Sequence, residues 1–106
     1  MENNCDPTYG LVDEILELLT KSKSLHILLV LDRKKDPIRF SKIKKLVESS
    51  STTVSRRLKE LEAYGLVSKN ELGVDSNMYE YSITEEGLSL SPIMQSLFDW
   101  VADRVQ

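Results

Sequence analysis

Side chains that could read a DNA duplex gather between residues 50 and 69. Val54, Leu58 and Leu61 form an apolar stripe at helical spacing, and the opposite face carries hydroxyl and basic side chains. Small hydroxyls allow close approach to a base edge, arginine can hold guanine through two hydrogen bonds, and basic groups neutralise phosphates. The side chains expected to serve these purposes are Ser51, Thr52, Thr53, Ser55, Arg56, Arg57 and Lys59. An ordinary solvated helix of mixed charge is the alternative interpretation at this point.

The charge distribution supports a nucleic-acid partner although the net charge is −3. Residues 33–69 hold 11 basic and 4 acidic side chains, whereas residues 1–32 hold 2 basic and 6 acidic ones. Residues 70–106 are also acidic, with 1 basic and 7 acidic side chains. Because partners respond to the local field, a basic centre between acidic ends points to a polyanion. A lysine-rich solubility face remains the alternative.

A second short helix is expected immediately before this stretch. Phe40, Ile43, Leu46 and Val47 have helical spacing, Ser41 can cap the helix, and Lys42, Lys44 and Lys45 face outward. Gly65 follows the longer helix and is suited to the left-handed conformation that ends it. Two helices joined by the tight turn at residues 48–51 form a helix-turn-helix, although this turn lacks the glycine often found there.

Two strands are expected next, over residues 66–72 and 78–83. Tyr79, Tyr81 and Ile83 alternate with Glu80 and Ser82, and turn-forming residues fill positions 73–77. A β-hairpin directly after a helix-turn-helix is the arrangement called a winged helix. Lys69 and Asn77 are the wing residues that could touch phosphate or the minor groove.

Wide apolar surfaces are expected on both terminal helices, at residues 11–20 and 85–105, after a flexible tail over residues 1–10. Pro92 requires the last helix to begin, kink or restart near it. A buried helix is expected over residues 25–31, directly after the first terminal helix. The terminal surfaces are too wide for one small core, which favours a two-fold homodimer over a purely intramolecular core. The residues expected at its interface are Leu11, Ile15, Leu19, Leu97, Trp100 and Val101.

Composition argues against several other classes of protein. The sequence offers no glycine-rich phosphate loop, no metal-ligand cluster and no partner for a nucleophile, so we expect neither an enzyme nor a cofactor or metal site. The single histidine, His26, is expected in the core or an interface rather than as a base. No apolar run approaches the roughly 20 residues that span a bilayer, so no membrane partner is expected. One cysteine cannot form an internal disulfide, which fits the reducing cytoplasm.

Several blocks in order resemble the HxlR-type winged-helix regulators, a group related to the MarR regulators. They are Arg39–Ile43, Val54–Glu62, Gly65–Val67, Tyr79–Gly87, Leu90–Pro92 and Leu97–Trp100. The resemblance implies a dimeric bacterial or archaeal transcription regulator that binds a pseudo-palindromic operator. Cys5 before Asp6 and Pro7 resembles the N-terminal cysteine that some members use as a redox or electrophile sensor, with an unused surface thiol as the alternative.

The expected architecture is therefore mainly α with a small β-hairpin wing, in the α+β class. The expected partners are double-stranded DNA and a second copy of the chain, with the identity of any small-molecule effector open. Base-edge contacts are assigned to Ser51, Thr52, Thr53, Ser55 and Arg56. Phosphate contacts are assigned to Lys42, Lys45, Arg57, Lys59 and Lys69. A winged-helix protein–protein adaptor and a non-specific architectural DNA-binding protein remain the alternatives.

Overall fold

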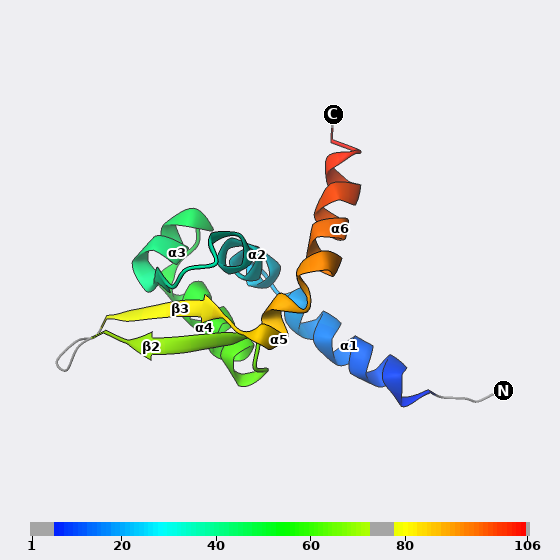
Figure 1. Cartoon of the computed structure of the whole chain (residues 1–106), viewed down its shortest axis with the longest axis horizontal. Coiled ribbons are helices and arrows are strands. Elements are labelled where there is room, and N and C mark those ends of the chain that lie inside the picture. Colours follow the sequence, from blue (N-terminus) through cyan, green and yellow to red (C-terminus); the bar gives the residue numbers. More distant parts are fainter. Residues whose placement is uncertain (1–5, 73–77, 106) are drawn as a thin grey trace.

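The structure is a computed structural model, and it describes residues 6–72 and 78–105. The described chain folds into helices and one small sheet, and both terminal helices project from the central body (Figure 1). The elements in chain order are α1 (Pro7–Leu19), α2 (Ser24–Lys34), β1 (Ile38–Arg39), α3 (Phe40–Leu46), α4 (Ser51–Ala63), β2 (Val67–Glu71), β3 (Tyr79–Ile83), α5 (Glu85–Leu88) and α6 (Ser91–Ala102). The helix-turn-helix is α3 and α4, and the wing is β2 and β3, which confirms the predicted fold class.

The sheet is antiparallel and has the strand order β1-β3-β2. In the wing, Val67 pairs with Ile83 and Lys69 pairs with Tyr81, as expected for a hairpin of alternating residues. The strand β1 was not expected from the sequence. It is only two residues long and pairs Ile38 with Tyr81, so it is too short to show a period of two.

The core lies where α2, α4 and the sheet meet. Ile27, Leu28 and Leu31 of α2 are fully buried, which confirms the buried helix expected near residues 25–31. Val54, Leu58 and Leu61 of α4 are also fully buried, so the apolar stripe of that helix faces the body. The opposite face of α4 is thereby directed to solvent.

Two helix starts differ from the sequence prediction. Helix α1 begins at Pro7, because Asp6 caps it by accepting a hydrogen bond from the Thr8 amide at 2.9 Å and proline suits the first turn. Residues 7–10 are therefore helical rather than part of a flexible tail. Helix α3 begins at Phe40 with no side-chain cap, so Ser41 lies inside the helix and does not cap it.

The stretch expected as one terminal helix over residues 85–105 forms two. Thr84 caps the short α5 by accepting from the Gly87 amide at 3.0 Å. A new helix, α6, starts at Ser91 with Pro92 in its first turn, where the missing amide proton costs nothing. Leu18 is the buried residue of α1 and Met94 that of α6, so both helices extend into solvent over most of their length (Figure 1).

Candidate nucleic-acid interface

The first turn of α4 is organised by its cap. Ser50 Oγ accepts a hydrogen bond from the Thr53 amide at 3.2 Å and lies 3.1 Å from Thr53 Oγ1. This arrangement satisfies a free amide of the first turn and turns the Thr53 hydroxyl back toward the helix start. Thr53 is partly buried, whereas Ser51 and Thr52 are exposed. Thr53 is therefore less available for a base edge than the sequence suggested.

The exposed face of α4 forms one side of a broad surface hollow. Its lining residues are Phe40, Ser51, Thr52, Ser55, Arg56 and Lys59. An adjoining hollow brings the end of α3 and the turn to the same side, with the lining residues Ser41, Lys44, Lys45, Glu48, Ser49 and Ser50. The structure thus gathers most of the predicted α4 contacts in the first hollow and places Lys45 in the second. It adds Lys44, which the lysine pair Lys44–Lys45 could have indicated from the sequence.

Arg57 departs from its predicted role as a phosphate contact. Its Nε donates to the Ser22 carbonyl at 3.0 Å, and its Nη1 lies 2.6 Å from Glu60 Oε1. The side chain is only 13% exposed. Arg57 therefore holds the link between α1 and α2, and it does not face solvent beside Arg56. Its hydrogen bond is also the main reason that the pKa of Glu60 lies below its ordinary value.

The tight turn between α3 and α4 contains a residue in the left-handed conformation. Glu48 has a φ of 51°, a value that glycine adopts at little cost and that a side chain makes unfavourable. Glu48 thus stands where this type of turn often has glycine. Its carboxylate also places a negative charge beside Lys44 and Lys45.

The described part of the wing presents one of its two predicted contacts. Lys69 is exposed, and its Nζ lies 4.0 Å from the centre of the Tyr79 ring, a cation–π geometry that keeps the ammonium near β3. Asn77 lies outside the described residues, as does Cys5. Lys42, the remaining predicted phosphate contact, is exposed beside Arg39 and Glu80.

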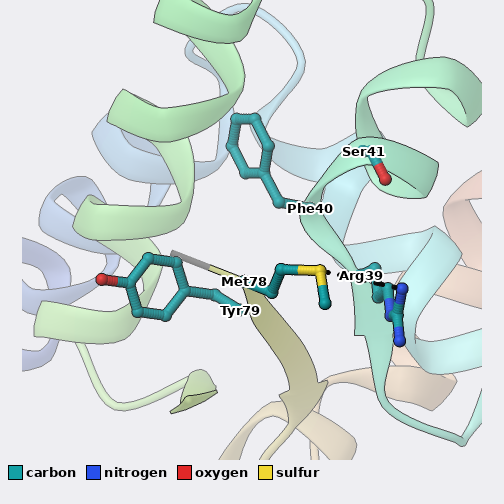
Figure 2. Close-up of a pocket in the computed structure, with 5 residues that line it drawn as sticks. All are labelled: Arg39, Phe40, Ser41, Met78 and Tyr79. Atoms are coloured by element: carbon teal, nitrogen blue, oxygen red, sulfur yellow. Dashed lines mark hydrogen bonds between the residues drawn. The ribbon is translucent and has the colours of Figure 1, made fainter. Parts of the chain in front are cut away.

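A smaller hollow of about 270 Å³ lies between the start of α3 and β3. Figure 2 shows Met78 between Tyr79 and Arg39, with Phe40 on the α4 side of the hollow. Arg39 Nη1 lies 3.9 Å from the Met78 sulfur, so a basic side chain borders this apolar surface. Arg39 was not among the predicted contacts. Its place in β1, a strand the sequence did not reveal, sets it beside the wing.

The terminal helices expose apolar side chains, but not all the predicted ones. Leu11 is 59% exposed, Leu97 49%, Trp100 56% and Val101 45%. Ile15 and Leu19 instead pack partly against the core, because the C-terminal end of α1 lies on the body. Val12 and Leu16 are exposed on α1 in their place.

His26 is exposed on α2, so of the two places expected for it, the core is excluded and an interface stays a prediction. Residues 6–72 and 78–105 contain no group of three or more histidine, cysteine, aspartate or glutamate side chains arranged to hold a metal ion. Within the same ranges, no helix has the length and apolar character needed to cross a bilayer.

A short helix, a tight turn, a capped helix with a basic outer face and a β-hairpin together define a winged helix-turn-helix domain. A family model, the HxlR-like helix-turn-helix, matches residues 18–106. The chain belongs to this family, which confirms the resemblance drawn from the sequence blocks.

Individual proteins agree with that placement. The chain is 40% identical over 65 residues to an uncharacterised HTH-type transcriptional regulator of Halalkalibacterium halodurans, covering 60% of this chain and 58% of that protein. The reduced form of the transcriptional regulator YodB from B. subtilis has a TM-score of 0.75 and 28% identity, with 96% and 95% of the two chains covered. A possible HxlR family transcriptional factor from Thermoplasma volcanium has a TM-score of 0.66 and 33% identity, covering 85% and 82%.

These relatives are named as transcriptional regulators and not as enzymes. The chain spans less than two thirds of the length of the curated relatives that it matches.

Proposed function

We propose that this protein is a transcriptional regulator that binds double-stranded DNA sequence-specifically, as a homodimer on a pseudo-palindromic operator. The observation that carries the proposal is the outer face of α4. Ser51, Thr52, Ser55, Arg56 and Lys59 line one open hollow on the helix that this fold presents to the major groove. Membership in the HxlR-like helix-turn-helix family supports the same conclusion.

The contacts divide by chemistry. Ser51, Thr52, Ser55 and Arg56 would meet base edges, with Arg56 suited to the two acceptors of guanine. Lys42, Lys45, Lys59 and Lys69 are exposed and would neutralise phosphates, joined by Lys44. Arg57 is left out of this set because its guanidinium is already engaged with Glu60 and Ser22.

The homodimer is supported by the exposed apolar residues on the two projecting helices. Leu11, Leu16, Leu97 and Trp100 are each about half exposed or more, and large apolar side chains left open to solvent are typical of protein–protein contact sites. A two-fold axis between α1 and α6 of two copies would cover them. The two α4 helices would then enter successive major grooves about 34 Å apart. Such a regulator would act in the cytoplasm.

A gel-shift titration of the protein on the DNA upstream of its own gene tests the proposal, at two salt concentrations. Tight retardation that weakens steeply with salt and survives competitor DNA is expected, because each neutralised phosphate releases counterions. A footprint with two-fold symmetry is expected for the homodimer. Retardation that competitor DNA abolishes would instead indicate an architectural protein. A folded protein that gives no retardation at either salt would favour a protein–protein adaptor.

A further inference from the structure

Two polar contacts tie the link between α1 and α2 to α4, and a third within α4 connects them. Arg57 Nε donates to the Ser22 carbonyl at 3.0 Å, and Arg57 Nη1 reaches Glu60 Oε1 at 2.6 Å. The other carboxylate oxygen, Glu60 Oε2, accepts from Lys21 Nζ at 3.2 Å. Lys21 and Ser22 lie in the link, whereas Arg57 and Glu60 lie one turn apart on α4. We call Lys21, Arg57 and Glu60 the clasp.

The clasp acts where the direction of α1 is decided. Leu18 is the buried residue of α1, and Leu11, Val12 and Leu16 are exposed, so the N-terminal part of the helix has little contact with the body. The direction of α1 is therefore set at its C-terminal end. The link that follows is tight, since the Ser24 amide donates to the Lys21 carbonyl at 3.0 Å and Lys23 has a φ of 70°.

The two halves of the clasp differ in their exposure to water. The Arg57 side chain is 13% exposed and Glu60 is 27% exposed, whereas Lys21 is 46% exposed. A charge-assisted contact is stronger and better defined where water is partly excluded. The contact from Arg57 Nε to the Ser22 carbonyl is therefore the main tie between the link and α4, and the Arg57–Glu60 contact within α4 orients the guanidinium for it. Lys21 adds a weaker, more solvated tie to Glu60.

We propose that Arg57 and Glu60, assisted by Lys21, are positioning residues that hold α4 at a fixed angle to α1. The inference rests on the proposed function, because α1 belongs to the proposed dimer face. In a two-fold dimer, the angle between α1 and α4 in each copy determines how far apart the two α4 helices lie. The clasp would thereby select the spacing of the two half-sites without touching DNA.

A distance measurement between the two copies tests this without DNA. Ala63 is exposed on α4 and carries none of the contacts described above, so a spin label at Ala63→Cys, in a Cys5→Ser background, reports the position of that helix. We expect one narrow distance distribution by dipolar spectroscopy in the parent. Glu60→Gln and Arg57→Met should each widen it at least about twofold, with Arg57→Lys intermediate, because charge-assisted contacts are lost.

Lys59→Met is the matched control, since it removes a positive charge from the same helix on its exposed face. Its distribution should keep the parental width. Unchanged widths in folded Glu60→Gln and Arg57→Met proteins would overturn the inference while leaving the dimer intact. No dipolar signal in the parent would overturn the dimer as well, so the two failures are distinguishable.

DNA binding provides the second readout. One base pair inserted between the half-sites should weaken DNA binding by the parent about tenfold. The same insertion should weaken binding by Glu60→Gln less than about threefold, because its looser dimer can adapt to the altered spacing. Arg57→Met should leave the salt dependence of binding unchanged, whereas Lys59→Met should lower its slope by about one. If Arg57→Met also lowered the slope of the salt dependence by about one, Arg57 would be a phosphate contact and the proposal would be overturned.

Discussion

Arg56 and Arg57 are adjacent in the sequence and lie in opposite surroundings. Arg56 is exposed and lines the hollow on the outer face of α4, whereas Arg57 donates to the Ser22 carbonyl at 3.0 Å and is 13% exposed. Successive helical residues point about 100° apart, which is enough to direct one guanidinium outward and the next to the body. Under the proposed function, Arg56 would contact DNA, whereas Arg57 would position the helix.

Arg56→Ala should weaken operator binding about 10- to 100-fold and relax the preference at one base pair. A well-placed arginine–guanine contact is worth about 1–3 kcal/mol of discrimination. Because Arg56 is exposed, the melting temperature should change little. Fluorescence anisotropy on a labelled operator measures the affinity. An Arg56→Ala protein that binds the operator like the parent would contradict the assignment.

Glu48→Gly should raise the free energy of unfolding by about 0.5–1 kcal/mol. Glu48 has a φ of 51°, and glycine adopts that conformation without the steric cost of a Cβ. Urea denaturation followed by circular dichroism measures the change. Glu48→Ala keeps the Cβ and serves as the control, which should show no such gain. Equal stabilities for the two variants would mean that the left-handed conformation carries no cost here.

Gly87→Ala should lower the free energy of unfolding by about 1–3 kcal/mol, because the added methyl group would overpack the site. A Cβ at Gly87 would collide with the Leu66 carbonyl oxygen and lie 2.6 Å from Ile83 Cγ1. Gly10→Ala is the contrasting variant, since no described atom lies within 4 Å of a Cβ there. It should gain about 0.5–1 kcal/mol from helix propensity. Thermal unfolding of both variants and the parent measures these changes. A Gly87→Ala protein as stable as the parent would refute the predicted collision.

Acid should destabilise the parent more steeply than Glu60→Gln. The Arg57 hydrogen bond lowers the pKa of Glu60 below that of an unfolded chain, so the unfolded state binds a proton first as the pH falls. The stabilisation is complete above the ordinary glutamate pKa of about 4.3 and is lost as the pH drops through the folded value. Denaturation curves between about pH 6 and 3 measure both proteins. Parallel curves would show that Glu60 contributes no pH dependence.

Trp100→Ala should shift the protein from dimer to monomer at micromolar concentration. Trp100 is 56% exposed in the single chain, so its removal costs the monomer little but would remove a large aromatic anchor from a dimer face. Sedimentation velocity reports the species, and the melting temperature of the parent should rise with its concentration. A parent that sediments as a monomer would rule out the homodimer.

Patterns that are local in the sequence predicted the central domain well. The stripe at Val54, Leu58 and Leu61 places α4 correctly, because its periodicity is a property of one helix. The alternation from Tyr79 to Ile83 places β3 for the same reason. Asp6 before Pro7 was an N-terminal helix signal as well, and it explains why α1 starts before Leu11.

Features decided by distant contacts could not be predicted in this way. Arg57 lies at the edge of the helix face, and its role depends on Ser22, which is 35 residues away in the chain. The apolar residues of α1 share similar spacing, and only the contact of its C-terminal end with the body separates Ile15 from Leu16. Strand β1 exists because Ile38 and Arg39 pair with β3, and two residues carry no pattern of their own.

The strand order also bears on how the protein avoids unwanted self-association. With β3 in the centre, β1 and β2 are the edges of the sheet. One edge is only two residues long, and the other carries exposed Lys69 and Glu71. Short or charged edges resist the addition of a further strand from another molecule. The sheet is thus protected from fibril-like growth, which would leave the apolar helices as the surface for the proposed contact between copies.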